Sequence, residues 1–300
     1  DEQEVKIVEG LIANGIDKKT AEAIWELFPP FARYGFNKSH AVSYALISYQ
    51  TAYLKAHYPA EFMAAVLTTE MSDSSKMAIA LDATRQAGID ILAPCVNRSA
   101  AHFNVENGRI RFGLGAIKGV GLGAIEAIID ARKKADGAFD DLFALCKDLD
   151  LRTVGKKTIE ALASAGALDS FGGHRAQLVE GVELAWGWAQ KQQADKLAGQ
   201  SSLFGGAGGD GATYMPQMPN VALWSRGEQL RYERDLMGFY VSGHPLDGFA
   251  AETRTFASCT LGDASSIPHE SDQTAIGIIT DVTRRTTKSG RPIAFVTLED

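Results

Sequence analysis

The chain has 300 residues, a length that favours two or three domains over one. Hydrophobic residues make up 45% of the sequence and charged residues 22%, which is ordinary for a soluble globular protein. The net charge of −7 argues against a surface coated with DNA-binding cations, although a local basic site is still allowed.

The three cysteines, Cys95, Cys146 and Cys259, are far apart and form no CxxC pair. They therefore indicate neither a disulfide framework nor a zinc site, and they fit a reducing cytoplasm. No apolar run approaches the roughly 20 residues that a membrane span needs, and no signal peptide opens the chain. We expect a cytoplasmic protein without a membrane partner, and a piece of a longer one, since the sequence begins with Asp inside a helical pattern.

The N-terminal quarter of the sequence is predicted to be entirely helical. The spacing of apolar residues indicates five helices, over residues 3–14, from Asp17 to the Pro29-Pro30 break, and over residues 38–57, 60–71 and 75–87. On the third helix, Val42, Leu46, Tyr49 and Tyr53 recur at spacings of three and four. We expect these four side chains to pack inward.

The pattern then changes to short strands. Residues 89–96 are predicted to form a strand, and residues 103–105 and 110–112 alternate apolar and polar side chains around Asn107-Gly108. An Asn-Gly pair in this position favours a type I′ hairpin. Four further helices are expected, over residues 121–134, 139–147, 156–165 and 173–198.

The C-terminal third begins with a glycine-rich linker, residues 205–211, where no packed element is expected. Ser225-x-x-Glu228 is a capping-box pattern, which opens a helix that ends near Gly238. Residues 274–300 alternate β-branched and aromatic residues around a Lys-Ser-Gly turn, as the first strands of a β-barrel would. The predicted fold class is mainly α, a multi-domain α+β chain with a small β part.

The glycine-rich stretch over residues 117–124, Ile-Lys-Gly-Val-Gly-Leu-Gly-Ala, precedes an apolar helix. Gly119 and Gly121 allow a tight turn with positive φ, which frees amides to face a phosphate, and Lys118 adds a positive charge. The stretch is similar to a helix-hairpin-helix motif, which holds DNA through its backbone. The predicted DNA-backbone contacts are Lys118, Gly119, Val120, Gly121, Leu122 and Gly123.

A purely structural glycine turn is the alternative interpretation of this stretch. Dinucleotide binding is a weaker one, because it needs a βαβ unit and the preceding element here is a hairpin. Residues 154–162 look like a degenerate second copy without the second glycine. Residues 101–160 hold ten Lys and Arg against nine Asp and Glu, a local sum of +1, so we expect a modest, salt-sensitive contact with DNA.

Two other segments have the composition of binding sites. Gln200-Ser201-Ser202-Leu203-Phe204 places two apolar anchors and one amide in a flexible stretch, where they are hard to explain as core. Asn37, Lys38, Ser39 and His40 gather at the start of the third helix, where the helix dipole favours anions. Asn37 or Ser39 could instead serve only as a helix cap.

Residues 36–55 resemble, almost residue for residue, the end of the fingers domain of the bacterial family C replicative DNA polymerases. The 200–204 segment resembles the QxxLF peptide with which polymerases bind the sliding clamp, and residues 238–246 also resemble the family. The resemblance implies four regions: the end of the fingers (1–75), a helix-hairpin-helix and clamp-binding domain (76–210), a connector (211–270) and the truncated start of an OB fold (271–300).

For function, the resemblance implies part of a DNA-directed DNA polymerase, a nucleotidyltransferase of chromosomal replication. Its partners would be template–primer duplex, the sliding clamp through Gln200, Leu203 and Phe204, and other subunits of the replicative holoenzyme. Contacts with the incoming nucleotide or the template would come from Arg33, Asn37, Lys38, Ser39 and His40. Polymerisation needs Mg²⁺ held by Asp residues of a palm domain, and no matching constellation occurs here, so we expect no catalytic residue, metal or cofactor and no activity in this segment alone.

Three rival functions are alternatives to this interpretation. A non-catalytic DNA-repair scaffold with helix-hairpin-helix and OB modules would bind DNA without binding the clamp. A mutagenic paralogue of the same polymerase typically lacks a good clamp peptide. A DNA ligase could contain both modules, but residues 36–55 would have no place in it.

Overall fold

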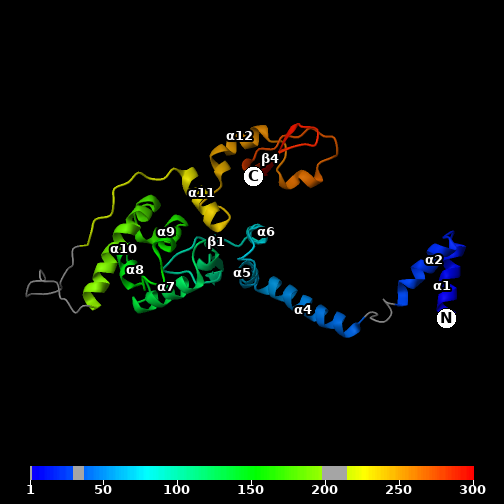
Figure 1. The fold of residues 1–300 in the computed structure, drawn as a ribbon, viewed down its shortest axis with the longest axis horizontal. Coiled ribbons are helices and arrows are strands. Elements are labelled where there is room, and N and C mark those ends of the chain that lie inside the picture. The colour runs from blue at the N-terminus through cyan, green and yellow to red at the C-terminus, as the bar shows by residue number, and fades with distance from the viewer. Residues whose placement is uncertain (1, 30–36, 198–214) are drawn as a thin grey trace, which may run out of the picture. The chain divides into compact units, whose positions relative to one another are not determined.

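The computed structural model describes residues 2–29, 37–197 and 215–300 (Figure 1). It confirms the predicted fold class, because long helices dominate and the strands form only small sheets. The chain divides into two compact units, Asp1–Pro59 and Ala60–Asp300, and each is described by itself. The four regional boundaries inferred from the sequence stay predictions.

The first unit contains α1 (Glu2–Ala13), α2 (Lys18–Glu26) and α4 (Lys38–His57). α1 packs against α2. Both later helices begin at a side-chain cap: Asp17 accepts from the amide of Thr20 at 3.1 Å, and Asn37 accepts from the amide of His40 at 3.2 Å. Because these caps depend on neighbouring residues, the helix starts predicted from the sequence agree closely with the observed ones.

The expectation that one face of α4 packs inward is wrong for this structure. None of its residues is buried, and the side chains of Val42 and Tyr49 are each 68% exposed. Spacing can identify an apolar face, but burial needs a partner surface, and the described residues of the first unit provide none. Tyr44, Ile47 and Leu54 are also exposed, so α4 has apolar side chains outside the predicted stripe as well.

The second unit opens with two helices and a three-stranded sheet. The helices are α5 (Pro59–Thr69), whose first residue closes the first unit, and α6 (Ser74–Gln86), and the strands are β1 (Ile91–Leu92), β2 (Asn104–Glu106) and β3 (Arg109–Arg111). The strand order is β1-β3-β2, with β1 parallel and β2 antiparallel to β3. Asn107 and Gly108 both have positive φ, 53° and 75°, as the predicted type I′ turn requires.

The strand predicted over residues 89–96 is much shorter than expected. Pro94 has no amide to donate, and the carbonyl of Ala93 accepts from Nη1 of Arg111 at 2.8 Å. Farther along, the amide of Val96 donates to the carbonyl of Ala167 at 2.8 Å, away from the sheet. Pairing therefore stops after Leu92.

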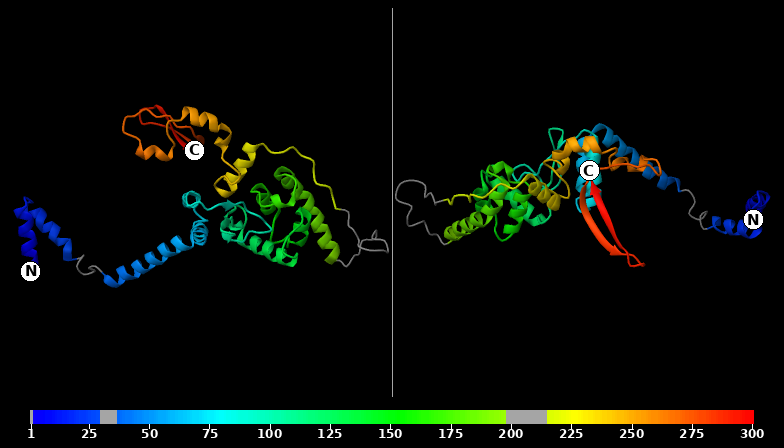
Figure 2. Two further views of the ribbon diagram at one scale, coloured as in Figure 1. Left: turned by 180° about the vertical axis from the view of Figure 1, so that it is seen from behind. Right: turned by 90° about the horizontal axis from the view of Figure 1, so that it is seen from above.

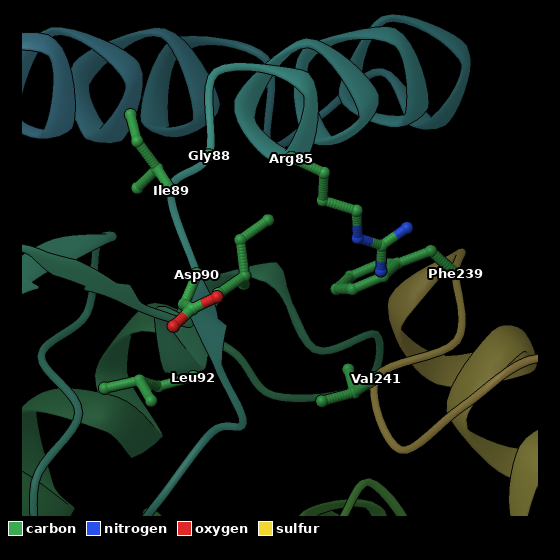
Figure 3. A pocket seen from close by; sticks show the side chains of 8 residues that line it. Arg85, Gly88, Ile89, Asp90, Leu92, Phe239 and Val241 are labelled. Carbon is green, nitrogen blue, oxygen red and sulfur yellow. The ribbon is translucent and has the colours of Figure 1, made fainter.

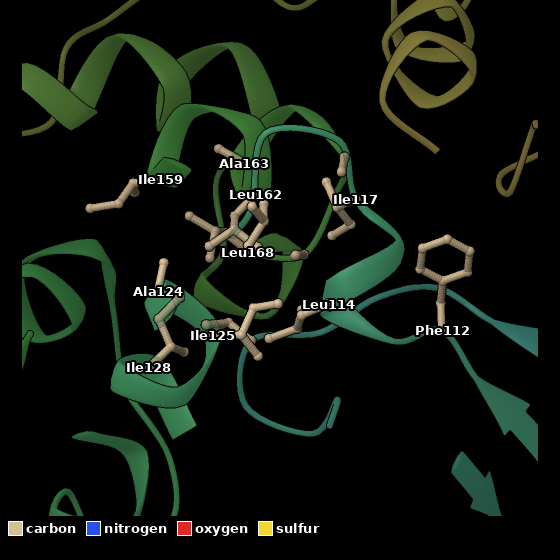
Figure 4. Packing of buried hydrophobic residues seen from close by; sticks show 14 of the residues in the cluster. Phe112, Leu114, Ile117, Ala124, Ile125, Ile128, Ile159, Leu162, Ala163 and Leu168 are labelled. Atoms are coloured by element: carbon tan, nitrogen blue, oxygen red, sulfur yellow. The ribbon is translucent and has the colours of Figure 1, made fainter. Parts of the chain in front are cut away.

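Four helices follow: α7 (Leu122–Lys134), α8 (Leu142–Asp148), α9 (Lys156–Ser164) and α10 (Arg175–Leu197). α10 packs along α8 and α9. The hydrophobic core lies among these helices and the hairpin, where Ile125 and Ile128 of α7 face Leu162 of α9 (Figure 4). All three side chains are fully buried. Burial of such side chains contributes roughly 1.5–3 kcal/mol each.

The C-terminal part contains α11 (Arg226–Met237), α12 (Ala250–Phe256), β4 (Ile278–Thr286) and β5 (Pro292–Glu299). α11 begins at the predicted Ser225–Glu228 capping box and ends at Gly238, whose φ is 84°. β4 and β5 form an antiparallel ribbon (Figure 2). Short 3₁₀ turns cover Leu114–Ala116, Asp169–Phe171, Pro245–Phe249 and Gly262–Ser266.

Candidate nucleic-acid interface

The glycine-rich stretch forms a tight turn that leads directly into α7. Gly119 adopts φ +86°, a conformation that side chains disfavour. Gly121 differs from the prediction: its φ is −77° and ψ 154°, because it is the extended N-cap residue of α7. Only one of the two glycines therefore supplies the left-handed turn.

Four residues of this turn are exposed and have backbone amides without a hydrogen-bond partner among the described residues. They are Gly119, Gly121, Leu122 and Gly123. A Cβ placed on Gly121 or Gly123 would meet nothing within 4 Å. These amides lie at the positive end of the α7 dipole, so the turn presents unpaired donors where an anion is favoured.

The remaining two predicted contacts are arranged differently. Val120 is buried, and its amide donates to the carbonyl of Ile117 at 3.2 Å, so the residue shapes the turn from within. The amide of Lys118 donates to the carbonyl of Leu236 on α11 at 2.8 Å. Only the exposed side chain of Lys118 is left to meet a ligand.

The predicted second copy also leads into a helix. Gly155 is the extended N-cap residue of α9, and Val154 before it is buried, as Val120 is in the first turn. Lys157 is exposed, whereas Nζ of Lys156 lies 2.6 Å from Oε1 of Glu183. This ion pair offsets the charge of Lys156, so Lys157 is the exposed lysine of the second turn, as Lys118 is of the first.

Packing of apolar side chains holds the two turns together. A Cβ on Gly119 would lie 3.8 Å from the Cβ of Ala161 on α9, so the first turn packs against α9. Ile117 projects into the same core as Leu162 and Leu168 (Figure 4). The buried apolar residues of the motif thus hold the backbone of the first turn in place, while its unpaired amides lie outside the core.

A buried ion cluster joins α10 and α11, and no sequence motif pointed to it. Glu233 is fully buried, and its Oε1 accepts from Nη1 of Arg175 at 2.8 Å. Nη2 of Arg175 lies 2.8 Å from Oδ2 of Asp169. Arg175 and Glu233 are 58 residues apart, so no local spacing could have paired them.

Burial alone would raise the pKa of Glu233. The amides of Ser242 and Val241, which donate to Oε2 at 2.9 and 2.8 Å, and the Arg175 guanidinium outweigh burial and hold that pKa below its ordinary value. The carboxylate is therefore charged, buried and fully hydrogen-bonded. The Glu233 carboxylate thereby holds α10, α11 and the segment after α11 in one arrangement.

At the start of α4, Asn37 acts as the helix cap, and its Oδ1 also accepts from the hydroxyl of Ser39 at 2.6 Å. Lys38 and His40 are exposed, and the ring of His40 lies 4.4 Å from that of Tyr44. Arg33 lies outside the described residues. The predicted nucleotide contacts of this group stay predictions.

The predicted clamp-binding residues Gln200, Leu203 and Phe204 also lie outside the described residues. After this segment, the carbonyl of Pro219 accepts from Nε2 of Gln177 on α10 at 3.0 Å. Among the described residues, no group of three His, Cys, Asp or Glu side chains is arranged to hold a metal ion. In the same residues, no helix is both long and apolar enough to cross a membrane.

Comparison with known proteins identifies the motif and the relatives of the chain. Residues 88–178 match a family model described as a helix-hairpin-helix motif. The DNA polymerase III subunit alpha of Vibrio cholerae is 41% identical over 293 residues, which are 97% of this chain and 25% of that protein. Proteins of the same name from Pseudomonas aeruginosa and Escherichia coli K12 are 40% and 38% identical, over 98% and 97% of this chain.

The chain spans about a quarter of the length of these relatives. Nearly the whole of it is nevertheless similar to one continuous segment in each of them. The match bears out the resemblance carried by residues 36–55 and the helix-hairpin-helix motif: this chain is similar to a segment of the bacterial DNA polymerase III alpha subunits.

Proposed function

We propose that this chain is the part of a bacterial replicative DNA polymerase that holds the template–primer duplex and attaches the enzyme to the sliding clamp. The complete enzyme would transfer nucleotidyl groups from dNTPs to a 3′-hydroxyl, in the cytoplasm and together with other subunits of its holoenzyme. The names of the relatives support the polymerase class. The matched helix-hairpin-helix model supports the contact with DNA.

One observation carries the DNA-binding part of the proposal. The exposed amides of Gly119, Gly121, Leu122 and Gly123 are unpaired among the described residues, at the N-terminus of α7. Backbone amides recognise phosphate oxygens and read no base, so binding would be independent of sequence. Lys118 adds one cation, which suits an enzyme that must move along every sequence.

The salt dependence of duplex binding tests this site. Lys118→Ala should weaken binding of a duplex to the 300-residue chain and lower the slope of log affinity against log salt by about 0.9, the value for one phosphate contact. Lys134→Ala is the matched control, because it removes the same charge at the far end of α7, about 20 Å along the helix axis. Equal losses in both variants, or no binding by the unaltered chain, would contradict the proposal.

The clamp-binding part rests on the sequence of residues 200–204. Leu203 and Phe204 would fill an apolar pocket of the clamp, and the Gln200 amide would supply hydrogen bonds. The double variant Leu203→Ala/Phe204→Ala should lose clamp affinity, whereas Ser201→Ala should keep it because no anchor is removed. Equal clamp affinity in all three proteins would remove residues 200–204 as the clamp-binding site, and duplex binding without any clamp binding would instead favour the DNA-repair scaffold.

For the start of α4, we propose that Lys38 contacts a triphosphate or template phosphate, assisted by Arg33 or His40. Lys38→Ala in the complete polymerase should raise the KM for dNTP. Lys55→Ala, in the last turn of the same helix, is the control for charge. An unchanged KM for dNTP together with an unchanged affinity for template–primer in Lys38→Ala would remove this assignment.

The isolated chain is proposed to be inactive in polymerisation. The two Mg²⁺ ions of such an enzyme would activate the primer hydroxyl and the leaving pyrophosphate. The described residues do not fit a site for them, because no cluster of acidic ligands forms. Metal-dependent incorporation of dNTP by the chain alone, measured by primer extension, would contradict this.

A further inference from the structure

We propose that helix α11 positions the DNA-binding turn, and that Glu233 and Leu236 are the positioning residues through which it acts. The inference rests on the proposed contact between duplex DNA and residues 118–123. Neither residue would touch DNA. Their effect would pass through the backbone of Lys118, directly before the left-handed Gly119.

The first link is the hydrogen bond from the amide of Lys118 to the carbonyl of Leu236, at 2.8 Å. Leu236 lies in the last turn of α11, where helix carbonyls have no partner within the helix. The turn supplies that partner, and in return the carbonyl fixes the peptide plane before Gly119. A shift of α11 would break this hydrogen bond between the Lys118 amide and the Leu236 carbonyl.

The second link is the anchoring of α11 by Glu233, one helical turn before Leu236. Oε1 is bound by Arg175 at the start of α10, and Oε2 is bound by the amides of Val241 and Ser242 after α11. Arg175 is only 10% exposed and also binds Asp169. One buried carboxylate thus joins α10, α11 and the segment that follows α11.

The third link is the packing of the segment after α11. The ring of Phe239 lies 5.3 Å from that of Phe112 and beneath the Arg85 guanidinium, which donates to the carbonyl of Tyr240 at 3.0 Å. Figure 3 shows Arg85 over Phe239 at one side of a pocket of about 410 Å³, with Val241 opposite Leu92. Because one side of this segment borders a pocket, packing alone does not hold it. The hydrogen bonds from Val241 and Ser242 to Glu233 also fix its position.

The first two links form one path from Arg175 through Glu233 and α11 to Leu236, and from there to the amide of Lys118. The third link holds the segment after α11, whose amides bind Glu233. Each step is a hydrogen bond or a helix, so the path is rigid only while Glu233 is ionised and paired. Loss of the charge would leave the amides of Val241 and Ser242 poorly satisfied and free α11 to shift. The open amides of the turn would then no longer be held ready for a phosphate.

The test compares Glu233→Gln with Asp235→Asn in the 300-residue chain. Both variants remove one negative charge from α11, but Asp235 is exposed and Glu233 is buried. Duplex affinity and amide hydrogen exchange are measured in the same buffer. We expect Glu233→Gln to bind duplex about tenfold more weakly and to exchange the Lys118 amide faster, while Ile125 and Ile128 stay protected; Asp235→Asn should match the unaltered chain.

Unchanged duplex affinity in Glu233→Gln would overturn the inference if Lys118→Ala still weakens binding, and the proposed DNA site would stand. Failure of the unaltered chain to bind duplex would overturn both. Should Glu233→Gln not fold, Arg175→Lys takes its place, because a lysine cannot bind Glu233 and Asp169 with the same fork. Faster exchange at Lys118 with weaker binding supports the inference in that variant, and unchanged binding overturns it.

Discussion

The side-chain amide of Asn97 pairs with both backbone groups of Phe139. Nδ2 donates to the carbonyl of Phe139 at 2.8 Å, and Oδ1 accepts from its amide at 2.9 Å. Phe139 is buried and belongs to no helix or strand, so its backbone groups have no ladder to join. The Asn97 side chain supplies the two hydrogen bonds that a neighbouring strand would otherwise supply, and so fixes the segment before α8.

Asn97→Asp should therefore destabilise the second unit. The carboxylate has nearly the same shape but no donor, which leaves the buried carbonyl of Phe139 unpaired. We expect a loss of about 1–3 kcal/mol in the free energy of unfolding, measured with urea at neutral pH. Asn14→Asp is the control, since the exposed Asn14 amide donates to the carbonyl of Gly10. Equal effects of the two substitutions would refute this role of Asn97.

Stability should fall in acid partly because of Glu233. Its pKa is lower in the folded chain than the ordinary value of 4.5, since the hydrogen bonds from Ser242, Val241 and Arg175 outweigh burial. Its stabilising contribution is complete above about pH 4.5 and is lost as the pH falls through the lower folded value. Urea unfolding between about pH 7 and pH 3 should show a shallower pH dependence in Glu233→Gln than in Asp235→Asn. Identical slopes would contradict the assignment.

The helix ends were predictable from the sequence because their causes are local. Asp17, Asn37 and Ser225 cap helices by accepting hydrogen bonds from backbone amides three positions away. The Asn107-Gly108 turn needs two residues that tolerate positive φ, and the sequence supplies them. Such features depend on neighbours in the chain, so reading the chain is enough to find them.

The parts that were not predictable depend on residues far apart in the sequence. The glycine turn was recognised, but nothing near Lys118 indicated that its amide would bind Leu236, 118 residues later. The Arg175–Glu233 pair was missed for the same reason. Val42 and Leu46 were expected to be buried from their spacing alone, yet burial is decided by whether another surface covers them, and the described residues of the first unit supply no such surface.

Cys146 should resist alkylation in the folded chain. Burial, with a smaller contribution from the nearby Asp141 carboxylate, raises the pKa of its thiol to about 12. The thiolate is the reactive form, so almost none is present near pH 8. We expect iodoacetamide to modify the partly exposed Cys95 and Cys259 well before Cys146, as followed by peptide mass spectrometry. Urea should make the three rates similar, and equal rates without urea would be evidence against burial of Cys146.

Gly113 and Gly121 offer a matched test of whether a glycine is needed for space. Their backbones are alike, with φ −76° and ψ 138° at Gly113 and φ −77° and ψ 154° at Gly121. A Cβ on Gly113 would lie 2.5 Å from the carbonyl carbon of His102, whereas a Cβ on Gly121 would meet nothing within 4 Å.

Gly113→Ala should therefore cost about 1–3 kcal/mol of unfolding free energy, because the contacted backbone must move. Gly121→Ala should change it by about 0.5 kcal/mol or less, since the lower entropy of the unfolded chain offsets a poorer N-cap. Urea unfolding of the two variants measures both values. Comparable losses would mean that the turn before α7 is more crowded than the open surface seen at Gly121, and a phosphate could not approach its amides there.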